Sequence, residues 1–169
     1  MSELKVLNWR VEVDPDATRR THDRMRAGGP ENCGCVSCRN FIATRFLAYP
    51  PEALELFARL GIRPDRESEV GGPSRLSDGT YGYDGWFHFI GAILKHPPVV
   101  TGVKRVNTPA GVREVPWNLV VCEDLRNNFL ICLDDEEADI VPPEFGGEPI
   151  VQLYFHTEVP WLLFEPPKD

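Results

Sequence analysis

The chain lacks the marks of a membrane or secreted protein. No apolar run approaches the roughly 18 residues that a membrane-spanning helix needs, so we expect no membrane partner. Residues 1–5 do not form the basic stretch, followed by an apolar core, that begins a secretory signal. The five cysteines are an odd number without the spacing of a disulfide scaffold, which favours metal binding or burial over cross-links. These absences predict a cytoplasmic protein with reduced thiols.

Several sequence motifs of enzymes are also missing. The chain contains no nucleophile elbow, phosphate-binding loop or dinucleotide fingerprint. The glycine pairs that begin at positions 28, 71 and 146 fall in expected loops, without the lysine or following helix that a phosphate site requires. Because no set of catalytic residues converges in the pattern, the sequence favours a non-enzymatic role.

Acidic residues are concentrated in the second part of the chain. The net charge is −8, with 11 Lys and Arg against 9 Asp and Glu in residues 1–66, and 7 against 17 in residues 67–169. An acidic surface repels phosphate backbones, so nucleic acid is not expected as a general partner. Four arginines (Arg19, Arg20, Arg24 and Arg26) form a local basic cluster, either a solvated face or a small exception to that rule.

The pattern of apolar residues predicts helices first and strands later, without βαβ alternation. Pro51 and Gly61 bracket a helix with one apolar side, and Ser37 is a candidate N-cap for the helix before it. A shorter polar helix is expected from Asp16 up to the turn at residues 28–30. Strands are expected over residues 4–13, 81–94, 99–106, 118–124, 129–134 and 149–156. We therefore predict one α+β domain over residues 1–169, in which two or three N-terminal helices pack on a mainly antiparallel sheet.

Three thiols lie within six residues, at Cys33, Cys35 and Cys38. Cys35 and Cys38 have the CxxC spacing with which two thiolates reach one tetrahedral Zn²⁺ ion, and Cys33 can supply a third. A fourth ligand would have to come from elsewhere in the chain. We expect His88 in this role, and the other candidates are His22, Cys122 and Cys132.

The same three cysteines allow two other interpretations. At a helix N-terminus a thiolate is stabilised, so Cys35 could act as a redox nucleophile with Cys38 as the resolving thiol. The motif does not follow a buried strand, however, as a thioredoxin-type site does. Alternatively the thiols only pack, which suits Cys38 beside Phe41 and explains Cys33 and Cys35 poorly.

Two further features are candidates for chemistry. In a strand, Trp86 and His88 point to one face and Phe87 to the other; His88 is then a metal ligand, a general base oriented by Asp84, or a hydrogen-bonded core residue. Cys122 and Cys132 lie on either side of an expected hairpin turn near residues 126–128. A three-residue turn would place these two thiols opposite each other, and a two-residue turn would place them on opposite faces.

Four short segments carry a resemblance: CGCVSCRNF at 33–41, PEAL at 51–54, GWFHF at 85–89 and EVPW at 158–161. Together they resemble an uncharacterised family of small bacterial proteins with CxCxxCRNF and C-terminal EVPW motifs. The resemblance implies a stand-alone cytoplasmic domain and brings no activity or catalytic residue.

The sequence thus favours a domain that binds an unknown protein or small molecule, with zinc stabilising the turn of residues 33–38. An acidic immunity-type domain that blocks a basic partner is one version of this hypothesis. The alternative is an enzyme that uses the cysteine cluster, either a metal-dependent hydrolase or a thiol oxidoreductase.

Overall fold

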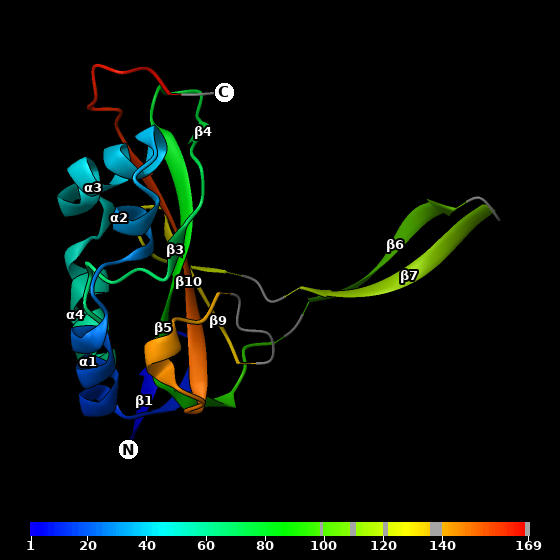
Figure 1. Ribbon diagram of the computed structural model, residues 1–169. Helices are drawn as coiled ribbons and strands as arrows, with labels where there is room; N and C mark the ends of the chain where they lie inside the picture. The colour runs from blue at the N-terminus through cyan, green and yellow to red at the C-terminus, as the bar shows by residue number, and fades with distance from the viewer. Residues whose placement is uncertain (99, 109–110, 120–121, 136–139, 168–169) are drawn as a thin grey trace.

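A computed structural model describes residues 1–98, 100–108, 111–119, 122–135 and 140–167, without the side chains of residues 100–119 (Figure 1). The helices are α1 Pro15–Arg24, α2 Gly29–Cys33, α3 Val36–Ala48 and α4 Pro51–Leu60, with a 3-10 turn η1 at Pro143–Phe145. The strands are β1 Ser2–Val6, β2 Trp9–Val13, β3 Glu69–Val70, β4 Ser74–Arg75, β5 Tyr81–Lys95, β6 Val100–Thr108, β7 Gly111–Leu119, β8 Glu123–Arg126, β9 Phe129–Asp134 and β10 Ile150–Val159. Helices precede most of the strands, so the α+β fold class is confirmed.

The described strands form an eight-stranded antiparallel sheet and a separate pair. The larger sheet has the order β1-β2-β5-β10-β9-β8, with β3 and β4 also paired to β5. Strand β5 is central because β10 pairs with it from Tyr81 to Ile90, and β2 pairs with it farther along. Strands β6 and β7 pair only with each other. None of the described helices has the length and apolar character that crossing a membrane requires.

The helices cover one face of the large sheet, as Figure 1 shows. Phe41 of α3 and Phe57 of α4 are fully buried and contact the aromatic rings of the sheet, including Phe155 and Phe87 respectively. Phe87 belongs to β5 and Phe155 to β10, and every second residue of each strand points toward the helices. The apolar core therefore lies between the helices and the central strands.

Local structure differs from the sequence prediction at two places near the N-terminus. Residues 4–13 are a hairpin rather than one strand, because Leu7 has a φ of 50° and the chain reverses there. Helix α3 is capped by Cys35 and not by Ser37, since the carbonyl of Cys35 accepts the N–H of Arg39 at 2.9 Å. The helix begins at Val36, and this places Cys38 in its first turn.

Candidate functional site

The three clustered cysteines meet at the junction of two helices. Cys33 ends α2, Cys35 caps α3, and Gly34 between them has a φ of 65°, a left-handed conformation that favours glycine. This sharp reversal brings the sulfur atoms of Cys33, Cys35 and Cys38 within 4.8 Å of one another, close enough to hold one metal ion. Cys33 and Cys35 are exposed, whereas Cys38 is buried. The group therefore forms a shallow site with two outer thiols and one inner thiol.

The two thiols of the CxxC pair differ in acidity. A hydrogen bond from the backbone N–H of Cys38, supported by Cys33 and the N–H of Ser37, lowers the pKa of the exposed Cys35 thiol. Burial raises the pKa of Cys38 well above its usual value, and its hydrogen bond to Cys35 acts in the same direction. Negative charge in the reduced cluster is thus favoured on Cys35.

His88 lies apart from the three thiols. Its ring is fully buried, with Nδ1 2.8 Å from the Ser68 hydroxyl and Nε2 3.3 Å from the Gln152 side-chain oxygen. Cys38 lies near Tyr83, whose hydroxyl donates to the carbonyl of Ser37 at 3.1 Å. Tyr83 and His88 are five positions apart along β5, which corresponds to about 16 Å of strand. In the structure His88 is a hydrogen-bonded core residue.

His22, also considered as a ligand, is held in one tautomer by two bonds. Its Nδ1 accepts the backbone N–H of Arg63 at 3.1 Å, and its Nε2 donates to the carbonyl of His88 at 2.9 Å. Burial lowers the pKa of His22, which agrees with a neutral ring. His22 therefore joins α1, the loop after α4 and strand β5.

The expectation against disulfides is wrong for Cys122 and Cys132, which are bonded to each other. The hairpin turn contains only Asn127 and Asn128, both with positive φ, and a two-residue turn alone would separate the thiols. An irregularity between Asp124 and Arg126 inserts one extra residue into β8 and restores the register. The two Cα atoms then lie 4.6 Å apart, the spacing of a directly opposed pair.

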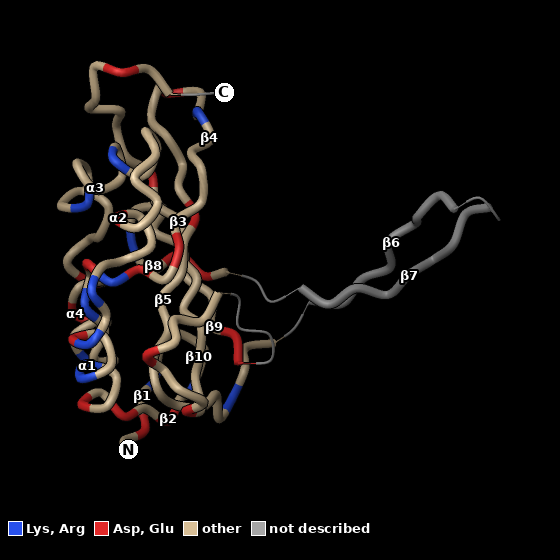
Figure 2. Tube along the Cα trace, viewed as in Figure 1, with Lys and Arg blue, Asp and Glu red and all other residues tan. Residues whose placement is uncertain are grey.

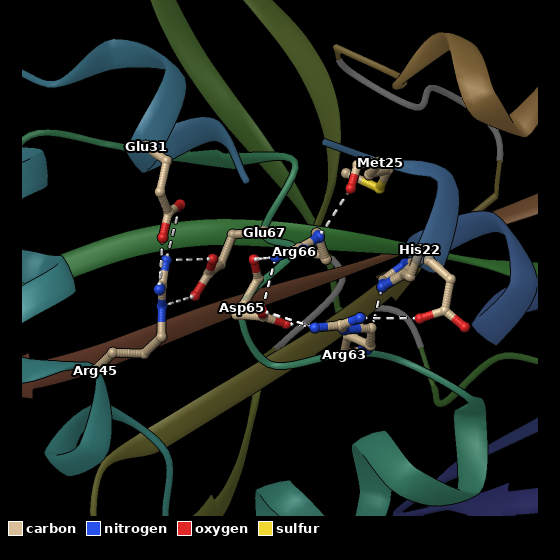
Figure 3. A network of polar contacts seen from close by, with 9 residues as sticks. His22, Met25, Glu31, Arg45, Arg63, Asp65, Arg66 and Glu67 are labelled. Atoms are coloured by element: carbon tan, nitrogen blue, oxygen red, sulfur yellow. Dashed lines mark hydrogen bonds and ion pairs between the residues drawn. The ribbon is translucent and has the colours of Figure 1, made fainter. Parts of the chain in front are cut away.

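A buried ion-pair network, which the sequence pattern did not indicate, connects α2 to α3 (Figure 3). Glu67 is fully buried and receives two bonds of 2.9 Å from Arg45 and one of 2.7 Å from the Tyr49 hydroxyl. Arg45 also contacts Glu31 of α2 at 2.7 Å. Burial raises the pKa of Glu67 to about 7, although Arg45 and Tyr49 oppose this effect. No periodicity could have revealed this network, because Glu67 lies in a loop far from its partners in sequence.

A second polar cluster lies on the sheet face opposite the helices. Asp84 was considered as the residue that would orient a catalytic His88; in the structure it accepts hydrogen bonds from His156 Nδ1 at 2.8 Å and from the Tyr154 hydroxyl at 2.5 Å. The register explains this arrangement, since Asp84 and His156 are direct partners across β5 and β10. The imidazole lies over Gly82, where an added Cβ would meet His156 Cε1 at 2.9 Å. Neither His156 nor this contact was foreseen from sequence.

The basic residues of α1 lie on the surface. Arg19, Arg20 and Arg24 are exposed on this helix, and Figure 2 shows blue segments along α1. Two of them have partners, because Arg19 pairs with Asp16 at 3.5 Å and Arg24 donates to the carbonyl of Glu144 at 2.8 Å. This agrees with the interpretation of the cluster as a solvated face.

Comparison with known proteins adds no family to these observations. No family model matches the chain, and no curated protein or solved structure is significantly similar to it. The resemblance to an uncharacterised bacterial family therefore stays a prediction, and the function has to be argued from the geometry.

Proposed function

We propose that this chain is a binding domain in which Cys33, Cys35 and Cys38 hold one Zn²⁺ ion as thiolates. The supporting observation is the convergence of the three sulfur atoms within 4.8 Å. Tetrahedral zinc with Zn–S bonds of about 2.3 Å separates its sulfur ligands by about 3.8 Å, so only small side-chain rotations are needed. The lowered pKa of Cys35 further favours a thiolate there.

The ion would stabilise the junction between α2 and α3. Helix α2 has only five residues, too few to be stable alone, and only Gly34 and Cys35 separate it from α3. A metal bound by the last residue of α2 and the first turn of α3 fixes their angle, as Arg45 does through Glu31. The partner is a protein or a small molecule, and the acidic second part of the chain suits a basic protein, as in an immunity-type domain.

Metal content and thiol reactivity of the full chain test this proposal. Protein purified without chelator should contain about one zinc per chain, with its three clustered thiols protected until the metal is removed. Cys35→Ser should lose most of the zinc and unfold at lower temperature. The double variant Cys122→Ser/Cys132→Ser is the matched control and should keep the zinc. A metal-free protein with three reactive thiols, after attempted zinc loading, contradicts the proposal.

A thiol oxidoreductase is the second candidate, because the two CxxC thiols differ in the way that redox pairs do. The Cys35 thiolate would attack a substrate disulfide, releasing one substrate thiolate and forming a mixed disulfide. Cys38 would then lose its proton and attack the Cys35 sulfur, leaving a Cys35–Cys38 disulfide and the second substrate thiolate. Alkylation separates the candidates. A redox site predicts zinc-free protein, preferential labelling of Cys35 over Cys38, and nearly unchanged stability of Cys35→Ser.

A further inference from the structure

We infer that the proposed zinc site has one coordination position that the chain leaves open to a neutral nitrogen donor from outside, such as an imidazole. This inference rests on the proposed function. An open position would mean that the zinc binds an external ligand in addition to stabilising the fold. Structural zinc sites are closed by four protein ligands, whereas sites that act on a ligand keep an exchangeable position.

The imidazoles of the chain are held at other places. The chain has four histidines, and all of them lie in the described residues. His22 and His88 are fully buried, with both ring nitrogens of each in hydrogen bonds. His96, just after β5, faces Asp135 at 3.9 Å, and His156 is bonded to Asp84 on the sheet face away from the helices. A histidine of this chain therefore reaches the thiols only if the fold is rearranged.

Sulfur and carboxylate ligands are similarly restricted. The two remaining cysteines, Cys122 and Cys132, are joined in the β8–β9 hairpin. Among the described residues, no carboxylate oxygen joins the group of atoms that lie within 4.8 Å of one another. Within the part of the chain that the structure describes, the cluster thus offers three thiolates and no fourth ligand.

The exposure of the thiols indicates where the open position lies. Cys38 is buried under the junction, whereas Cys33 and Cys35 are exposed, so the ion would sit with its fourth side toward solvent. Zn²⁺ with three thiolates carries one net negative charge. A neutral imidazole or water is therefore favoured over another anion at this position. A histidine of a protein partner and a free small-molecule heterocycle share this donor chemistry.

Cobalt substitution tests the inference with the full chain. Co²⁺ replaces Zn²⁺ in thiolate sites, and its d–d bands respond to a change of the fourth ligand, while its sulfur-to-cobalt charge-transfer bands report the thiolates. Titration with imidazole should shift the d–d bands saturably and leave the charge-transfer bands in place. A second titration uses a histidine-containing peptide, with the same peptide carrying alanine as the control. It tests whether the imidazole of a protein side chain, like free imidazole, reaches the open position of the metal.

The outcomes separate the inference from the proposed function. Absence of thiolate charge-transfer bands would overturn the zinc site itself. If the charge-transfer bands are present but imidazole does not shift the d–d bands, the chain itself supplies a fourth ligand. This result contradicts the inference and leaves the proposed zinc site standing. The variants His88→Gln and His156→Gln, checked for folding by circular dichroism, should leave the cobalt spectrum unchanged. A changed spectrum in a folded variant would identify that histidine as the fourth ligand.

Discussion

The side-chain oxygen of Asn40 accepts the backbone N–H of Leu162 at 2.8 Å. The amide nitrogen of the same residue donates to the carbonyl of Pro160 at 3.2 Å and to the Tyr83 hydroxyl at 3.2 Å. Asn40 is fully buried two residues after Cys38, so it ties the segment after β10 to the helix that carries the thiols. The segments CGCVSCRNF and EVPW, far apart in sequence, thus meet through this one side chain.

Replacing Asn40 with alanine should destabilise the protein and loosen its C-terminal segment. The change leaves the N–H of Leu162 and the carbonyl of Pro160 without their partner, at a cost of about 1–3 kcal/mol. Urea denaturation measures the loss, and limited proteolysis should cut the chain after residue 159 more readily. Asn8→Ala is the control, since Asn8 bonds Glu123 at the surface. Equal losses of stability for Asn40→Ala and Asn8→Ala would contradict the role of Asn40 in holding the C-terminal segment.

Glu67 should make stability depend on pH. Its pKa is raised from 4.5 to about 7 in the fold, so the folded state holds the proton more tightly than the unfolded state. The free energy of unfolding should therefore fall as pH rises from about 4.5 to about 7, by at most about 3 kcal/mol, and then level off. Denaturation curves from about pH 5 to about pH 8 should show this component in the native protein and not in Glu67→Gln. Glu55→Gln, at an exposed position of α4, is the control and should retain the pH-dependent component. If stability changes with pH in the same way in all three proteins, Glu67 is not its source.

Gly82→Ala should disturb the Asp84–His156 pair. The new Cβ would meet the imidazole at 2.9 Å, so the ring must move and lengthen its bond to Asp84. We expect a loss of about 1 kcal/mol, the net value of one hydrogen bond, and a shifted His156 resonance in NMR spectra. The cost should shrink in a His156→Ala background, a double-mutant cycle that isolates this contact. Gly72→Ala, where nothing lies within 4 Å, is the matched control. If the losses of stability of Gly82→Ala and His156→Ala simply add in the double variant, the contact between the new Cβ and the imidazole is ruled out.

Reduction of the Cys122–Cys132 bond should lower the melting temperature. The bond closes a loop between residues ten positions apart, which in the chain-entropy model contributes about 2–3 kcal/mol. The native protein should melt lower with a phosphine reductant than without it. The variant Cys122→Ser/Cys132→Ser should melt at one low temperature under both conditions. A melting temperature of the native protein that does not respond to reductant would contradict the disulfide in solution.

Local pattern was sufficient for much of the fold. Pro51 and Gly61 marked α4 because helix termini have side-chain preferences that act within one turn. The alternation along β5 assigned Phe87 to the face opposite Trp86 and His88, since successive strand residues point to opposite faces, and Phe87 is buried there. The grouping of Cys33, Cys35 and Cys38 was visible because these thiols are neighbours in the chain and a single turn brings them together.

Contacts that depend on strand register or on distant loops required the tertiary structure. One extra residue in β8 decided that Cys122 meets Cys132, and the pairing of β5 with β10 gave Asp84 to His156 rather than to His88. Likewise Glu67 meets Arg45 only when the loop after α4 packs on α3. Side-chain chemistry within one turn is fixed by local sequence, whereas pairing between distant segments depends on how all the layers pack, which no local pattern records.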